Sequence, residues 1–270
     1  MKEKALITLA LVFGIVYSAL AIVPVEIDSH SNLPEIDYNA FKPGEKLTYK
    51  VHYGIIDAGE AKIELKESPY TFSNRPTYHA VGTGNSIGAF DLFFKVRDTY
   101  ETYIDRDGVF PWYFKRRVDE GGYKISQDYT FDHNRGTVST QKEETHTVPA
   151  GVQDIISAFY YARTFDYSGA KKGDIFEIPT FLDDEMHLLK IKYIGKETIK
   201  IRKGKYNCLK FVPVVQKGRI WKDESDLNIW ISDDDNKIPV LCKTKILVGS
   251  IKMELTDYSG LAHKIAKVKK

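Results

Sequence analysis

The sequence predicts a mainly β protein, in which a large antiparallel meander forms a curved barrel-like or two-lobed sheet, with one main helix near residues 151–164. Three observations support this fold class. Apolar and polar residues alternate along many short segments, turn-forming residues separate those segments, and helical spacing is sustained in one stretch. Successive side chains of a strand point to opposite faces, so each alternating segment has one buried and one solvated side.

The alternation is clearest in residues 46–53, where Leu47, Tyr49, Val51 and Tyr53 are separated by polar residues. The same pattern returns in residues 60–66, 189–193, 227–231 and 251–255. Such segments are typical of strands that cover a core on one face only.

Turn-forming residues lie between the strand-like segments. They occupy residues 105–108, 120–122, 134–136, 203–204 and 233–236, and Gly54 and Gly59 bracket another short connection. Short connections favour antiparallel hairpins, because a parallel pair would need a long crossover between its strands.

One helix is indicated after Pro149, where Val152, Ile155, Phe159 and Ala162 recur at helical spacing. A shorter candidate covers residues 89–95. The longer helix divides the strands into two sets, so the pattern leaves open two lobes or one large curved barrel.

The first residues predict export. Lys2 and Lys4 precede an apolar run over residues 5–16, and small residues at 19 and 21 complete the pattern of a cleavable signal peptide. We therefore expect a signal peptide (1–21), an extended lead-in (22–40), a single β-rich domain (41–260) and a basic, solvated tail (261–270). The mature chain would be periplasmic, with no transmembrane anchor after cleavage.

Charge and cysteine content limit the partners. The formal net charge is +2 at pH 7, which argues against a nucleic-acid partner because such a surface would need concentrated positive charge. The two cysteines, Cys208 and Cys242, would be exported to an oxidising compartment. The sequence leaves open whether they form a disulfide or stay as buried thiols.

No catalytic set is assembled in the sequence. Residues 84–88 match the G-x-S-x-G pattern around Ser86, but strands follow strands here, whereas the hydrolase fold that uses this turn alternates strands with helices. The acidic residues 233–236 lack the later glycine and glutamate of a calcium loop, and the histidines show no zinc-binding spacing. We expect no catalytic residues, no metal and no cofactor.

Aromatic residues give the one candidate for ligand binding. Rings lie beside cations in residues 110–117, and Trp112, Tyr113 and Arg116 are the predicted ligand-binding residues. Such a group could stack sugars or line an apolar cavity. The competing interpretation is that these rings fill the β core.

Several short motifs lie along the chain: G-E-x-L-x-Y-x-V-x-Y-G at 44–54, A-G at 58–59, V-x-D-x-Y-E at 96–101, Q-D-I at 153–155, W-I-S-D-D at 230–234, I-P at 238–239 and G-S at 249–250. Together they resemble a family of exported bacterial proteins, domain-of-unknown-function family 3108. The resemblance covers residues 41–258 and implies a periplasmic, antiparallel β-barrel-like fold, similar to envelope proteins of exopolysaccharide or capsule loci. It implies no activity.

The sequence thus predicts a non-catalytic envelope protein that binds an apolar or glycan ligand or an envelope protein. The alternative is a hydrolase that acts on an envelope ester or glycan, through Ser86 or a carboxylate pair.

Overall fold

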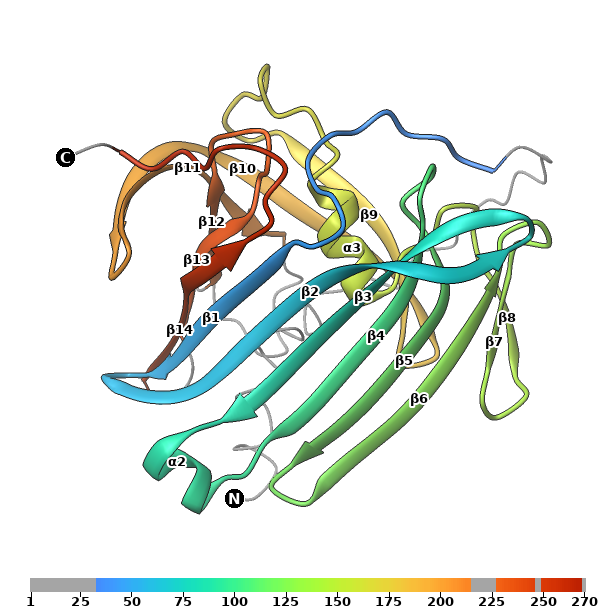
Figure 1. Ribbon diagram of the computed structural model, residues 1–270, viewed down its shortest axis with the longest axis horizontal. Coiled ribbons are helices and arrows are strands. Elements are labelled where there is room, and N and C mark those ends of the chain that lie inside the picture. Colours follow the sequence, from blue (N-terminus) through green and yellow to red (C-terminus); the bar gives the residue numbers. More distant parts are fainter. Residues whose placement is uncertain (1–32, 215–226, 246–248, 269–270) are drawn as a thin grey trace.

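The computed structural model describes residues 33–214, 227–245 and 249–268, and the signal-peptide prediction lies outside these ranges. One antiparallel sheet of fourteen strands dominates the described chain (Figure 1). The first eight strands are β1 (Lys46–Tyr53), β2 (Ile56–Phe72), β3 (Arg75–Ser86), β4 (Arg97–Asp105), β5 (Pro111–Glu120), β6 (Tyr123–Asp132), β7 (Thr137–Thr140) and β8 (Thr145–Thr147). The other six are β9 (Ile175–Leu182), β10 (Glu185–Ile201), β11 (Gly204–Pro213), β12 (Leu227–Ser232), β13 (Pro239–Lys245) and β14 (Ser250–Ser259).

The predicted fold class is confirmed, and one continuous sheet replaces the two-lobed alternative. Strands β1 to β8 form one meander and β9 to β14 form a second, and β1 pairs with β14 to join them. The order across the sheet is β8-β7-β6-β5-β4-β3-β2-β1-β14-β13-β12-β11-β10-β9, so β8 and β9 are its two ends.

The period-two pattern places the core on the inner face of the curved sheet. Leu47, Tyr49 and Val51 of β1 are buried, and Val51 lies opposite Met253 of β14, which is also buried. The intervening polar residues face outward. Because consecutive strands are paired, the same alternation continues from strand to strand and gives one concave apolar surface.

The main helix, α3 (Ile155–Ala162), lies inside this curve and follows directly on the turn region after β8 (Figure 1). The sequence predicted a helix over 151–164, and the structure begins it later, because Asp154 is the N-cap. Its Oδ1 accepts hydrogen bonds from the backbone N–H groups of Ile156 (2.7 Å) and Ser157 (2.8 Å), and the Ser157 hydroxyl accepts one from the Asp154 N–H (2.8 Å). This capping box satisfies donors that would otherwise be buried unpaired.

The short candidate helix is also present, as α2 (Gly88–Phe93) between β3 and β4. Neither helix could cross a lipid bilayer in the described ranges, since α3, the longer, has eight residues and a crossing needs about 20.

Side chains connect the two halves of the molecule across the open side of the sheet. Asp183 and Asp184 form the turn between β9 and β10. Asp183 accepts a hydrogen bond from Arg116 of β5 (2.9 Å), and Asp184 accepts one from Tyr129 of β6 (2.9 Å) and one from Lys142 (2.8 Å). The backbone of Gln153 also pairs with β9, through its N–H to Pro179 and its carbonyl to Phe181.

The C-terminal segment corrects the prediction of a solvated tail. Within residues 261–268, Ile265 is buried and Lys267 forms a bridge with Tyr206 of β11. The pairing of β11 with β12 begins at Cys208, and beside it the Asn207 carbonyl accepts a hydrogen bond from the Asp233 N–H (2.9 Å), so the part of β11 before residue 207 has no partner in β12. The C-terminal segment covers that edge, with hydrogen bonds between Asn207 N and Ala266 O (3.0 Å) and between Val268 N and Lys205 O (2.9 Å).

We predict that Asp154→Ala lowers the free energy of unfolding by about 2–4 kcal/mol, because α3 loses its cap and the buried Thr102 hydroxyl loses its acceptor, Asp154 Oδ2 (2.5 Å). Urea unfolding followed by circular dichroism measures the change. Ser157→Ala removes one bond of the same box and is the matched control, with an expected loss of about 1 kcal/mol. An equal loss in the two variants would contradict this role for Asp154.

Candidate functional site

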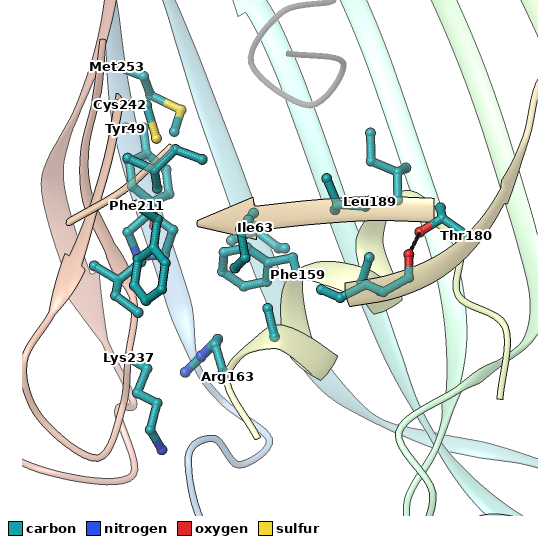
Figure 2. Close-up of a pocket in the computed structure, with 18 of the residues that line it drawn as sticks. Tyr49, Ile63, Phe159, Arg163, Thr180, Leu189, Phe211, Lys237, Cys242 and Met253 are labelled. Carbon is teal, nitrogen blue, oxygen red and sulfur yellow. Dashed lines mark hydrogen bonds between the residues drawn. The ribbon is translucent and has the colours of Figure 1, made fainter. Parts of the chain in front are cut away.

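The candidate site is an apolar cavity of about 210 Å³ between α3 and the concave face of the sheet (Figure 2). Its walls come from α3, from β1 and β2, and from the strands of the second meander. Both meanders and the helix therefore have to assemble before the cavity exists. Almost all of the surface that lines it is apolar, which suits a molecule without hydrogen-bonding groups.

One face of α3 supplies the helical wall. Ile155, Ala158, Phe159 and Ala162 line the cavity, and their spacing of three and four residues puts them on one stripe of the helix. Ile156 and Tyr160 are on the other side and are fully buried in the core. The helix is thus apolar on two sides, because one side packs on the sheet and the other faces the cavity.

Arg163 and Glu45 form a buried ion pair at one end of the cavity. The Arg163 guanidinium donates to both carboxylate oxygens of Glu45, at 2.6 and 2.7 Å, and the two side chains are 2% and 0% exposed. The guanidinium also donates to the carbonyl oxygens of Asn236 (2.8 Å) and Ala40 (2.9 Å). Burial acts to lower the pKa of Arg163, but the Glu45 carboxylate more than compensates and holds it above its usual value.

The remaining polar groups at the cavity are few. The Tyr49 hydroxyl is buried and lacks a hydrogen-bond partner among the described residues, and burial raises its pKa well above the usual value. The Thr180 hydroxyl donates to the Ile178 carbonyl (3.1 Å). Lys237 lies at the same end as Arg163 (Figure 2). Tyr49 is therefore a lining residue whose buried hydroxyl has no partner among the described residues.

The cysteines are both free and buried, and Cys242 lines the cavity. Of the two states that the sequence left open, the structure shows buried thiols. Burial raises the pKa of each thiol to about 12, so neither is a thiolate at neutral pH.

The three predicted ligand-binding residues do not converge on one site. They lie on β5, where Trp112 and Arg116 point to the buried face and Tyr113 points to the opposite, partly exposed face. The Trp112 indole donates to Asp105 (3.0 Å), and Arg116 donates to Asp183 (2.9 Å) and Gln127 (3.1 Å). None of the three lines the cavity. Ligand binding by them stays a prediction.

The Ser86 hydroxyl is hydrogen-bonded within the loop that contains α2. Ser86 is the last residue of β3 and is buried. Its hydroxyl donates to Asp91 and accepts a hydrogen bond from the Val96 N–H (2.8 Å), which closes the loop that contains α2. Among the histidines, His133, His187 and His263 bond to backbone carbonyl oxygens elsewhere, and His146 lies on β8.

The acidic turn at 233–236 also has a local role. Asp234 Oδ1 accepts hydrogen bonds from the Ser232 hydroxyl (3.0 Å) and the Asn236 N–H (2.9 Å), as expected for a polar hairpin turn. In the described ranges, no group of three histidine, cysteine or acidic side chains could hold a metal ion.

The cavity and its ion pair were missed at the level of sequence. The signal that could have indicated them is the helix itself, which is apolar on two faces and is followed at once by Arg163. A charge at that position, next to a buried helix, requires an opposite charge nearby. Glu45 is 118 residues away along the chain, so spacing alone could not identify it.

The fold and the cavity define a β-barrel-like protein with an apolar interior site. Residues 48–256 match the family described as "Protein of unknown function (DUF3108)", and the chain belongs to this family, as its motifs predicted. No curated protein matches the chain.

One solved structure gives the same fold class. The chain is similar to a beta-barrel-like protein of domain of unknown function DUF1849 from Brucella abortus, with a TM-score of 0.51 and 11% identity over 85% of this chain and 99% of that one. It is less similar to a DUF1089 family protein from Pseudomonas aeruginosa, with a TM-score of 0.37 and 10% identity over 67% of this chain and 87% of that one. At this identity, the Brucella abortus structure supports the fold alone.

We predict that Arg163→Met lowers the free energy of unfolding by about 3–5 kcal/mol, because Glu45 is left as an unpaired buried charge. The double variant Glu45→Met/Arg163→Met removes both charges and should be more stable than Arg163→Met alone. Urea unfolding of the two single variants and the double variant measures the coupling. Additive losses would show that the ion pair does not act as a unit.

A second prediction concerns His133, which packs against Trp112. Its Nε2–H donates to the Pro111 carbonyl (2.7 Å) and its Nδ1 accepts from the Gly151 N–H (3.3 Å), so both nitrogens are occupied in the neutral ring. Burial lowers its pKa to about 4. The unfolded pKa of about 6.5 lies higher, so the neutral ring stabilises the fold fully above pH ~6.5 and this contribution falls as the pH drops towards 4.

His133→Phe should therefore flatten the dependence of urea stability on pH between pH 7 and 4, by roughly 3 kcal/mol at most. Phe114→Leu, a buried substitution on β5 that involves no titratable group, is the control and should lower the stability by the same amount at every pH. An unchanged slope in His133→Phe would contradict the assignment.

Proposed function

We propose that this chain is an exported, non-catalytic protein of the bacterial envelope that holds an apolar ligand in the cavity between α3 and the sheet. The observation that supports the proposal is the cavity itself, an apolar space lined by both meanders and by one stripe of the helix. Its volume of about 210 Å³ exceeds the ~150 Å³ of an engineered apolar cavity that stays dry and binds benzene.

An apolar ligand fits the lining better than a glycan does. A sugar carries several hydroxyl groups, each of which loses free energy when it is buried without a partner. The cavity offers the Tyr49 hydroxyl, while the Thr180 hydroxyl is already bonded to Ile178. A molecule with an apolar body and at most one polar end, such as a short acyl chain, therefore matches the residues present.

The polar end of such a ligand would lie beside Arg163 and Lys237, and its apolar body would extend towards Cys242 and Met253 (Figure 2). Arg163 is committed to Glu45 and two carbonyl oxygens, so it fixes the shape of the site. Lys237 is partly exposed and is the positive charge available to a ligand at that end.

Export of the protein is supported by the leader pattern of residues 1–21. The absence of an assembled nucleophile at Ser86, in the described part of the chain, supports binding over hydrolysis. An envelope location would bring the cavity close to lipids, which are the natural source of acyl chains.

We predict that the uncharged fluorophore N-phenyl-1-naphthylamine binds this protein saturably and that Ala158→Phe weakens binding by roughly tenfold or more, because the new ring fills the cavity. Fluorescence titration measures the binding. Ala262→Phe makes the same change at a partly buried residue away from the cavity and should bind like the wild type.

A stability measurement accompanies the titration. If Ala158→Phe unfolds at the same urea concentration as the wild type and still binds the fluorophore equally well, the cavity is not the binding site. Native mass spectrometry of protein purified from a periplasm tests the natural ligand, and protein that is consistently empty would count against the proposal.

A further inference from the structure

Large apolar side chains are exposed at one end of the sheet, on three separate connections. Leu92 and Phe93 of the α2 region are 84% and 88% exposed, and Ile55 in the β1–β2 turn is 99% exposed. Together with Ile56 and Tyr123 they form what we call the apolar rim. Single exposed apolar residues are common on proteins, but a concentration of them marks an interaction surface.

The three connections lie at the same edge of the molecule. Backbone hydrogen bonds join them in sequence along that edge, from Ile87 N to Ala58 O (3.0 Å) and from Gly121 N to Lys95 O (2.8 Å). Figure 1 shows the β1–β2 turn, α2 and the β5–β6 turn along the lower edge of the sheet. The apolar rim is therefore one surface, although its residues are far apart in sequence.

The helix α2 contributes to no core. It has six residues, none of them buried, and yet its sequence is Gly-Ala-Phe-Asp-Leu-Phe. Its position is fixed by polar contacts at its base, where Asp91 accepts hydrogen bonds from Arg97 at 2.8 and 3.0 Å and also bonds to Ser86. The fold thus holds Leu92 and Phe93 outward, where their side chains bury little surface.

The charges around the apolar rim are compatible with an anionic surface. The acidic side chains Asp91 and Asp119 are paired with Arg97 (2.8 Å) and Lys124 (3.4 Å). Lys95 is exposed beside Phe94 and adds a further positive charge. Asp57, next to Ile56, is likewise paired with Arg202 (3.1 Å), so Lys95 is the further positive charge that an anionic head group would meet at the base of the rim.

From these features we propose that the apolar rim docks on the surface of a lipid bilayer. Ile55, Leu92 and Phe93 insert among the acyl chains, Tyr123 lies at the level of the head groups, and the lysines contact anionic lipids. The rim is a row of protruding tips. A fluid bilayer accommodates such tips directly, whereas a protein partner would need a matching set of pockets.

The register of the sheet links this surface to the cavity. Ile251 lies opposite Tyr53, next to the β1–β2 turn, and Met253 lies two residues further along β14. The Met253 end of the cavity therefore points towards the apolar rim, and the Lys237 end points away from it. Docking at the rim does not depend on ligand binding in the cavity, but it would bring the apolar end of the cavity nearest to the bilayer.

The first experiment measures partition onto vesicles of phosphatidylethanolamine and phosphatidylglycerol, with mature protein purified from the periplasm of an expressing host. The double variant Leu92→Ser/Phe93→Ser should reduce the partition coefficient by roughly tenfold or more. Tyr70→Ser/Ile175→Ser is the matched control, because these side chains are also large, apolar and exposed but lie off the rim. This double variant should partition like the wild type.

The second experiment locates the contact. In vesicles that contain brominated lipids, the added fluorescence of Phe93→Trp should be quenched, and that of Tyr70→Trp should not. Absence of vesicle binding by the wild type, equal loss in the rim and control variants, or equal quenching at positions 93 and 70 would each overturn the proposal. So would a wild-type dimer that becomes monomeric in Leu92→Ser/Phe93→Ser without any change on vesicles, since a second copy would then cover the rim.

Discussion

The buried ion pair between Arg163 and Glu45 is the interaction on which the interior of this protein depends. It joins the end of α3 to the start of β1, and the same guanidinium bonds to the carbonyl oxygens of Ala40 and Asn236. Three segments that are distant in sequence, around residues 40–45, 163 and 236, thus meet at one side chain. A charge buried this deeply is tolerated only when every donor has an acceptor, so the geometry of those segments is tightly constrained.

The cavity is a consequence of that constraint. The helix is held at its N-terminus by the hydrogen bond from Thr102 of β4 to Asp154 (2.5 Å) and at its C-terminus by the ion pair of Arg163 with Glu45, and a shift onto the strands of the second meander would break these contacts. The cavity between α3 and these strands is lined by apolar side chains, which form no hydrogen bonds with water. Proteins usually fill such spaces, because empty volume costs stability. A space kept open by fixed polar contacts at both ends of a helix is what a binding site requires.

The open sheet adds a second feature. The Asp183–Asp184 turn connects β9 and β10 to β5 and β6 by charged hydrogen bonds. Arg116, which the sequence indicated for ligand binding, is one of the residues that make this connection. Arg116 is buried, and its bond to Asp183 helps to connect the two meanders of the open sheet. On the surface, α2 and two neighbouring turns expose apolar side chains that do not pack in the core. The exposed rim and the interior cavity are therefore two separate apolar surfaces.

The sequence determined most of the architecture. Alternation in segments such as 46–53 predicted the strands and their buried faces, turn residues predicted their antiparallel order, and the family motifs predicted a β-barrel-like fold. These features are local, because the period of a strand and the chemistry of a turn are set by neighbouring residues. The start of α3 differed from the prediction, because its N-cap depends on side-chain hydrogen bonds, and the spacing of apolar residues does not reveal them.

The site was decided by tertiary structure. Nothing near Glu45 in the sequence indicates Arg163, and the cavity walls combine residues from Tyr49 to Met253. Trp112, Tyr113 and Arg116 were grouped because they are neighbours on one strand, but Tyr113 points to the opposite face from Trp112 and Arg116, so the three do not face one pocket together. The prediction of a solvated tail was wrong, because residues 265–268 cover the part of β11 that β12 leaves unpaired. Each of these outcomes depends on which strands are adjacent, and adjacency between distant segments exists only once the sheet has formed.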